Sequence, residues 1–168
     1  MTSCYRWILG GLLLLALGAR AGEPGLQLVG EAHLKFLFWP IYHSQLYSAD
    51  GSYQAGQRPL QLDIHYQRSI AAGDLVTRTG LEWETQGLAH PQQQQWLQRL
   101  RELWPDVDNG DVLTLAVGPD DVSRFYLNGE LLGHMDDPAF TRSFLDIWLS
   151  PNTSRPELRL ALIGQADS

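Results

Sequence analysis

Apolar and polar residues alternate with a period of two along several segments, which predicts a β-sheet. In Leu26–Phe38, apolar residues and glycine occupy every second position, and mostly polar residues lie between them. Leu60–Gln67 shows the cleanest alternation of the chain. This period is typical of a strand with one buried face. Further strands are predicted at Ile41–Tyr47, Val112–Val117, Val122–Leu127 and Glu130–Met135.

The segment Phe36–Tyr47, FLFWPIYHSQLY, is rich in aromatic residues and contains a proline. Pro40 cannot donate to a strand ladder, so it marks a bend or an edge. Both faces become apolar from Leu37 onward. We therefore expect a bend between the first two strands, buried against a helical layer, with its aromatic residues in the core. A role of these residues in a pocket wall is the alternative.

Apolar residues spaced three or four apart predict four helices. They cover about Asp74–Gln86, the segment from His90-Pro91 to Pro105, the segment from Asp137-Pro138 to Pro151, and Pro156–Ile163. Asp74 and Asp137 are the expected N-caps of the first and third helices. Asn128-Gly129 predicts a type I′ hairpin turn. The predicted fold class is α+β, an open-faced antiparallel sheet with helices packed on one face.

Residues 1–21 have the three-part order of a secretory signal peptide: an arginine, an apolar run of about a dozen residues, and Ala19-Arg20-Ala21 as the cleavage pattern. The run is shorter than the roughly 20 residues that span a bilayer. We expect cleavage, no membrane span afterwards, and one domain at residues 22–168. Retention of the segment as an uncleaved anchor is the alternative.

Composition narrows the possible functions of the expected mature chain. It contains no cysteine, which excludes a disulfide scaffold and a thiolate metal site. Loss of Arg6 and Arg20 changes the formal net charge from −7 to −9, with 10 basic against 19 acidic residues. Such a surface repels polyphosphate, so nucleic acid is not an expected partner.

The sequence lacks the common catalytic motifs. It contains no nucleophile elbow, phosphate-binding loop, dinucleotide fingerprint or paired-histidine zinc motif. Its five histidines are scattered, and His33 and His65 are expected to be solvated on polar strand faces. Asp106–Asp111 lacks a glycine at the position that a calcium loop requires and also lacks the distal glutamate, which favours a simple turn. We therefore expect no metal and no cofactor.

One strand carries candidate binding chemistry. The apolar face of Leu60–Tyr66 continues to Arg68, which places a phenol and a guanidinium at the end of an apolar row. If this face lines a cleft, it suits an amphiphile with a carboxylate head, which a guanidinium can hold bidentately. The candidate ligand-binding residues are Arg68, Tyr66, Tyr42, Tyr47 and Trp83. The alternative is that Arg68 simply emerges at the strand end and that the tyrosines lie at the core edge.

Three segments of the chain resemble the exported bacterial chalcone-isomerase-like proteins. They are GEAHLKFLFWPIYHSQLYSADG (Gly30–Gly51), the strand that ends Tyr66-Gln67-Arg68, and FYLNGELLGHMDDPAFTRSFLDIWLSPNTS (Phe125–Ser154). The similarity extends from Gly30 to about Gly164. It implies the chalcone isomerase fold, which agrees with the pattern above, and a periplasmic location. It also implies kinship with eukaryotic fatty-acid binders that use an arginine and a tyrosine, a role that chemistry and fold analogy give here to Arg68 and Tyr66.

The resemblance does not imply that this chain has the activity of the plant isomerase. The segment before the first strand, residues 22–25, has no arginine. Leu75 stands where the catalytic tyrosine is expected, and Glu82 near the expected asparagine. Without a cation and a hydroxyl network, the electrostatic stabilisation of an enolate is missing.

Three functional hypotheses follow. The first is a non-catalytic exported protein that binds an apolar or fatty-acid-like small molecule between sheet and helices. The second is a structural or accessory module with no small ligand that acts through a protein partner. The third is an enzyme with a rearranged site, for which Glu82 is the candidate titratable group.

Overall fold

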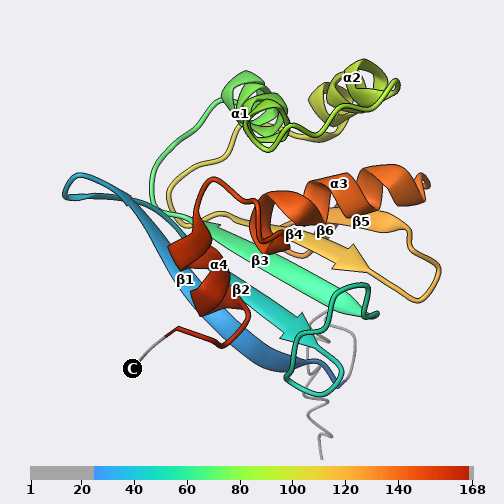
Figure 1. Cartoon of the computed structure of the whole chain (residues 1–168). Helices are drawn as coiled ribbons and strands as arrows, with labels where there is room; N and C mark the ends of the chain where they lie inside the picture. Colours follow the sequence, from blue (N-terminus) through green and yellow to red (C-terminus); the bar gives the residue numbers. More distant parts are fainter. Residues whose placement is uncertain (1–24, 167–168) are drawn as a thin grey trace, which may run out of the picture.

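Six strands form one antiparallel sheet in which neighbours along the chain are neighbours in space (Figure 1). The computed structural model describes residues 25–166. The strands are β1 (Gln27–Phe36), β2 (Trp39–Ser48), β3 (Leu60–Tyr66), β4 (Val112–Val117), β5 (Ser123–Leu127) and β6 (Glu130–Met135). Because every pairing is antiparallel and consecutive, the sheet is a simple meander.

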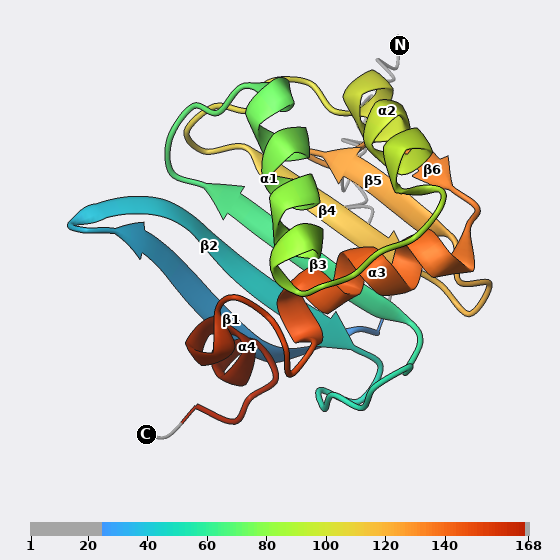
Figure 2. The same cartoon turned by 45° about the horizontal axis from the view of Figure 1, so that its top comes forward.

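Four helices cover one face of this sheet (Figures 1 and 2). The helices α1 (Ala72–Thr85) and α2 (Gln93–Leu103) lie between β3 and β4 in the sequence. The helices α3 (Pro138–Leu149) and α4 (Pro156–Leu162) follow β6. No helix of the described residues covers the other face. The predicted α+β class with an open-faced sheet is confirmed.

The core lies between the sheet and the helices. On β3, Leu62 and Ile64 are buried while Gln61, Asp63 and His65 on the opposite face are half-buried, as the period of two requires. Trp83 of α1 is the largest fully buried side chain. Its indole N–H donates to the Ser143 carbonyl of α3 at 2.8 Å, so one aromatic residue joins two helices.

The ends of the helices and the tip of one hairpin test the caps and the turn that were predicted from the sequence. Asp137 caps α3 as expected, accepting from the Ala139 N–H at 2.9 Å. Asn128 and Gly129 both have positive φ, 52° and 86°, which confirms the type I′ prediction. Helix α1 begins before Asp74, so Asp74 is not its N-cap. Asp106 instead accepts from the Ala72 N–H at 2.8 Å, a contact between residues far apart in the sequence.

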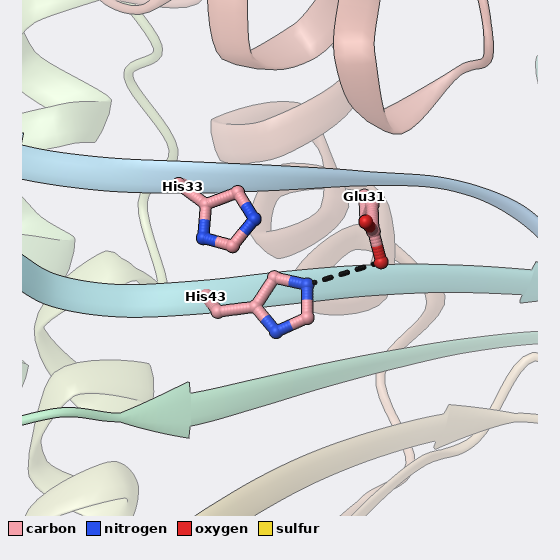
Figure 3. A group of neighbouring side chains, drawn as sticks. All are labelled: Glu31, His33 and His43. Carbon is pink, nitrogen blue, oxygen red and sulfur yellow. Dashed lines mark hydrogen bonds and ion pairs between the residues drawn. The ribbon is translucent and has the colours of Figure 1, made fainter.

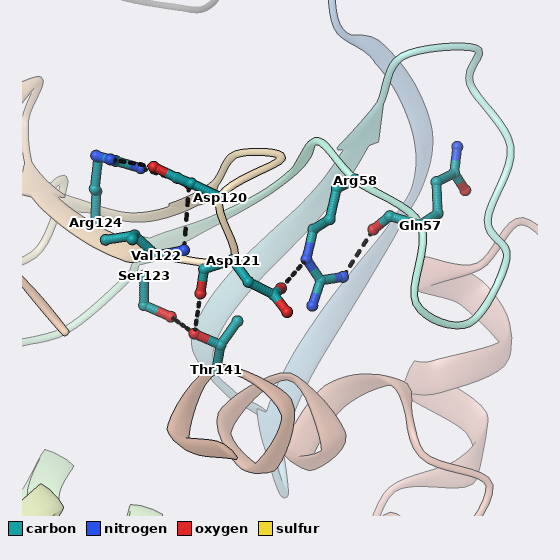
Figure 4. Close-up of polar contacts among 8 residues, drawn as sticks. All are labelled: Gln57, Arg58, Asp120, Asp121, Val122, Ser123, Arg124 and Thr141. Atoms are coloured by element: carbon teal, nitrogen blue, oxygen red, sulfur yellow. Dashed lines mark hydrogen bonds and ion pairs between the residues drawn. The ribbon is translucent and has the colours of Figure 1, made fainter. Parts of the chain in front are cut away.

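A polar cluster fixes the first turn of α3 to the sheet (Figure 4). Thr141 Oγ1 donates to the Asp121 carbonyl at 2.8 Å and lies 2.8 Å from Ser123 Oγ. Both hydroxyl-bearing residues are fully buried. The carboxylate of Asp121 accepts from Arg58 Nε at 2.6 Å, which ties the loop before β3 to the turn between β4 and β5. Two loops and the start of α3 are therefore held together at one end of the sheet.

The prediction for the FLFW segment is wrong. Residues Phe36–Trp39 form the tip of the β1–β2 hairpin and are not buried against helices. The side chain of Phe38 is 95% exposed and that of Trp39 is 72% exposed. The hairpin extends beyond the helical layer, so no helix reaches its tip (Figure 2). Pro40 pairs with Lys35 within the ladder, and the bend occurs instead at Leu37, whose φ is 55°.

The expected signal peptide, residues 1–21, lies outside the described residues. Within residues 25–166, no helix is long and apolar enough to cross a membrane.

Candidate ligand-binding site

A cavity of about 390 Å³ lies between the sheet and three of the helices. Its floor comes from β1, β2, β3 and Leu113 of β4, and most of its walls come from α1, α3, α4 and the segment between α3 and α4. The lining of the cavity is mostly apolar. Its apolar residues include Leu34, Ile41, Ile64, Ile147, Trp148 and Leu158. This volume falls in the range of about 300–1,000 Å³ that is typical of small-molecule sites.

Charged groups also line the cavity. Arg78 and Glu82 are one helical turn apart on α1 and form an ion pair of 2.5 Å. Glu82 is 7% exposed, and its second oxygen accepts from Ser154 Oγ at 2.5 Å. The Arg78 side chain remains 59% exposed, so its guanidinium is not closed off by Glu82.

Arg155 adds a second cation to the cavity lining. It is exposed and precedes α4. Within residues 25–166, no carboxylate lies within ion-pair distance of Arg155. With Arg159, whose Nε donates to the Leu149 carbonyl at 2.7 Å, three guanidiniums line the cavity against the carboxylates of Asp74 and Glu82. The lining is therefore net positive in a protein that is acidic overall.

Two phenols lie on the sheet side of the cavity. Tyr42 and Tyr66 are cross-strand partners, and their rings meet edge to face at 6.5 Å. Burial raises the pKa of both phenols well above the ordinary value. Both therefore stay protonated at neutral pH and can offer an O–H to a ligand oxygen.

The structure brings together only some of the residues predicted from sequence. Tyr42 and Tyr66 line the cavity. Tyr47 lies on the opposite face of the sheet, where its hydroxyl donates to Gln45 at 3.1 Å. Trp83 is packed in the core and is not a lining residue.

Arg68 does not continue the apolar row of β3. The strand ends at Tyr66, so the alternation no longer applies two residues later, and Arg68 is exposed and outside the cavity lining. The cations that do line the cavity, Arg78 and Arg155, come from a helix and a loop. No spacing rule links them to β3, so the sequence pattern gave no signal for either.

An open-faced antiparallel meander with helices over one face defines the fold class of this chain. Residues 16–164 match the family model described as chalcone isomerase-like. The chain belongs to the chalcone isomerase-like family.

Two known proteins show how far this likeness reaches. An uncharacterized protein of Haemophilus influenzae is 32% identical over 142 residues, which is 84% of this chain and 70% of that protein. The crystal structure of a fatty-acid binding protein of Arabidopsis thaliana matches with a TM-score of 0.63, over 87% of this chain and 90% of that one. At 12% identity, this second likeness shows the fold alone.

Proposed function

We propose that this protein binds an amphiphile with an apolar tail and a carboxylate head, without catalysing a reaction. The observation that carries the proposal is the cavity itself, which has apolar walls and two accessible guanidiniums. The fatty-acid binding protein with the same fold supports the same class of ligand. The hypothesis of an accessory module without a small ligand requires a filled interior, which this cavity does not favour.

The tail is proposed to occupy the space between β1–β3 and the helices α3 and α4. Leu34 and Ile64 contribute from the sheet, and Leu158 from α4. Removing apolar surface from water stabilises a complex by about 25 cal/mol per Å² before the costs of association. A largely preformed cavity keeps those costs low.

The head is proposed to contact Arg155 and Arg78. A guanidinium forms charge-assisted, bidentate hydrogen bonds with a carboxylate, and Arg155 has no competing carboxylate among the described residues. The neutral hydroxyls of Tyr42 and Tyr66 are further donors on the cavity wall.

Binding is favoured over catalysis by the state of the ionisable groups. Burial moves the pKa of Tyr42 and of Tyr66 away from neutrality, so neither phenol is suited to proton transfer at pH 7. Glu82 is held by Arg78 and Ser154, and is therefore not a free general base.

Titration with dodecanoate tests the proposal, with dodecanol as a ligand that has the same tail and no charge. We expect saturable binding of dodecanoate at one site per chain. Arg155→Ala is expected to weaken dodecanoate binding about tenfold. A charge-assisted hydrogen bond contributes about 1.5–3 kcal/mol, and the exposure of Arg155 to solvent reduces this contribution. Dodecanol affinity should be unchanged by the substitution.

Arg101→Ala, which removes an exposed arginine of α2, is the matched control and should bind like the wild type. Arg68→Ala separates the sequence-based site from the cavity and should also have no effect. An equal loss in all three variants, or no dodecanoate binding by the folded protein, would contradict the proposed site.

The place of action is proposed to be the periplasm. The signal-peptide pattern in residues 1–21 supports export, and the resemblance to exported bacterial chalcone-isomerase-like proteins supports the periplasm as the destination. Fractionation of the host cells followed by N-terminal sequencing tests this. A mature chain that begins at Gly22 in the periplasmic fraction is the expected result, and an intact N-terminus in the cytoplasm would contradict it.

A further inference from the structure

Two imidazoles and a carboxylate gather on the uncovered face of the sheet (Figure 3). Glu31 and His33 lie on β1, and His43 faces them from β2. One ligand atom of each residue lies within 4.8 Å of the others. We propose that this cluster binds one divalent transition-metal ion such as Zn²⁺, independently of any ligand in the cavity.

The strand geometry brings these three residues together. Glu31 and His33 are two residues apart, so their side chains leave the same face of β1. His33 is directly paired with His43 across the ladder, and their rings are stacked at 4.3 Å with an interplanar angle of 8°. A sheet with fixed register presents the three donors without a flexible loop.

The distances suit a tetrahedral ion. Zn²⁺ binds nitrogen and oxygen ligands at about 2.0–2.2 Å, which places neighbouring ligand atoms about 3.3 Å apart. His43 Nε2 and Glu31 Oε2 are already 3.3 Å apart. His33 is exposed, and one of its ring nitrogens lies within 4.8 Å of the ligand atoms of the other two residues.

Neighbouring groups position the carboxylate. Gln45 Nε2 donates to Glu31 Oε2 at 3.2 Å, and His43 Nε2 lies 3.3 Å from the same oxygen. Gln45 in turn contacts His65 Nε2 at 3.1 Å. Such outer contacts orient metal ligands and tune their affinity.

Three protein ligands leave at least one coordination position open to solvent. Two histidines and one carboxylate form a set that binds Zn²⁺, and Cu²⁺ should bind more tightly by the general order of divalent metal affinities. Sequence motifs do not reveal this site, because its histidines come from two strands with a hairpin between them.

Calorimetric titration of the untagged protein with ZnCl₂ at pH 7.5 tests the proposal. We expect one ion per chain. His33→Ala and His43→Ala should each weaken binding at least tenfold. Zn²⁺ should also raise the melting temperature of the wild type, since binding to the folded state stabilises it.

His134→Ala is the matched control. His134 also lies beside a carboxylate, with its Nε2 3.5 Å from Asp136, but this pair has no second imidazole in contact. The control should keep full Zn²⁺ affinity. Absence of saturable binding, or affinity that His33→Ala and His43→Ala leave unchanged, would overturn the proposed metal site.

The β1–β2 hairpin carries a separate feature, a tip of four successive exposed apolar side chains. Phe36, Leu37, Phe38 and Trp39 are 68%, 77%, 95% and 72% exposed, and Lys35 precedes them. We infer that this tip, Phe36–Trp39, inserts into the interface of a lipid bilayer. The purpose of that contact, ligand exchange with the membrane, rests on the proposed function, but the contact itself does not.

The chemistry of the tip fits a bilayer surface. Aromatic and leucine side chains partition into the boundary between head groups and acyl chains, and a flanking lysine can remain among the head groups. The tip is the protruding end of a two-stranded ribbon (Figure 1).

The cavity is continuous with this hairpin. Leu34, Ile41 and Tyr42 line the cavity and lie within a few residues of the tip. At about 3.3 Å per strand residue, Leu34 is about 10 Å from Leu37. Insertion of the tip by about 5–10 Å would therefore bring the cavity to the head-group level.

Flotation with phosphatidylcholine vesicles tests the inference on ligand-free protein. We expect the wild type to float, with little dependence on salt because the contact is apolar. In the double variant Phe36→Ser, Phe38→Ser, the partition coefficient between vesicles and buffer should fall at least tenfold. Leu131→Ser, which removes a 60% exposed leucine of β6, is the control and should float like the wild type.

A dodecanoate titration of the double variant separates this inference from the proposed function, because the cavity should remain competent. Absence of vesicle binding would overturn the bilayer inference. Analytical ultracentrifugation gives a second outcome that would overturn it: a dimer of the wild type and of Leu131→Ser, but a monomer of the double variant. The tip would then be covered by a second copy of the chain.

Discussion

At the scale of single residues, the carboxylate of Glu82 controls the charge that a ligand meets in the cavity. It is buried, and it pairs with Arg78 while accepting from Ser154. A neutral amide in its place can still accept the Ser154 hydrogen bond. It would, however, release the Arg78 guanidinium and remove the negative charge that opposes a carboxylate ligand.

Glu82→Gln is therefore expected to raise dodecanoate affinity several-fold and to leave dodecanol affinity unchanged, as measured by parallel titrations. Glu84→Gln removes an exposed carboxylate two residues away and should change neither. Unchanged or weaker dodecanoate binding by Glu82→Gln would show that the head group lies elsewhere.

At the scale of elements, α4 closes one side of the cavity and rests on β1 at Gly30. A Cβ at this position would collide with the carbonyl oxygens of Ala161 and Leu162. These backbone atoms cannot yield without moving α4, which carries Leu158 and Leu162 of the cavity lining. The absence of a side chain at Gly30 thus lets a helix approach the strand closely.

Gly30→Ala is expected to lower the free energy of unfolding by about 1–3 kcal/mol, the usual cost of overpacking, and to weaken dodecanoate binding. Urea denaturation and titration measure the two effects. Gly73→Ala, in α1 with open space around its Cβ position, should instead stabilise by about 0.5–1 kcal/mol. Equal stability of Gly30→Ala and wild type would contradict the close approach of α4 to β1.

The same scale shows what the sequence could predict. Periodicity and turn chemistry are local, so β3, the Asn128-Gly129 turn and the Asp137 cap followed from them correctly. The predicted burial of the FLFW segment was wrong, because apolar character alone cannot distinguish a core strand from a hairpin that extends past its helices. Arg155 was missed for a related reason, since only the packing of α4 on the sheet brings it to the cavity.

At the scale of the whole molecule, acid stability depends partly on a carboxylate far from the cavity. Asp50 accepts from the Ser52 backbone N–H at 3.0 Å, from the Ser52 hydroxyl and from Gln57, and these bonds lower its pKa to about 2. Because the folded-state pKa lies below the unfolded value near 3.9, the stabilisation is complete above about pH 4. It disappears as the pH falls toward 2.

Asp50→Asn should therefore have a lower urea midpoint than wild type at pH 7, and the difference should shrink between pH 4 and pH 2. Urea denaturation at a series of pH values measures this. Glu84→Gln is a suitable control on an exposed carboxylate. A difference that stays constant down to pH 2 would show that the Asp50 charge does not contribute.

Occupancy of the cavity by a ligand is the central claim of the functional proposal. Native mass spectrometry of the protein isolated from its own host, followed by organic extraction of the same sample, measures it most directly. We predict a bound carboxylate-bearing amphiphile whose occupancy falls in Arg155→Ala and which is lost in Leu158→Trp, because the indole fills the cavity from α4. A ligand-free mass for the gently isolated wild type, or a ligand retained equally by both variants, would contradict binding at this site.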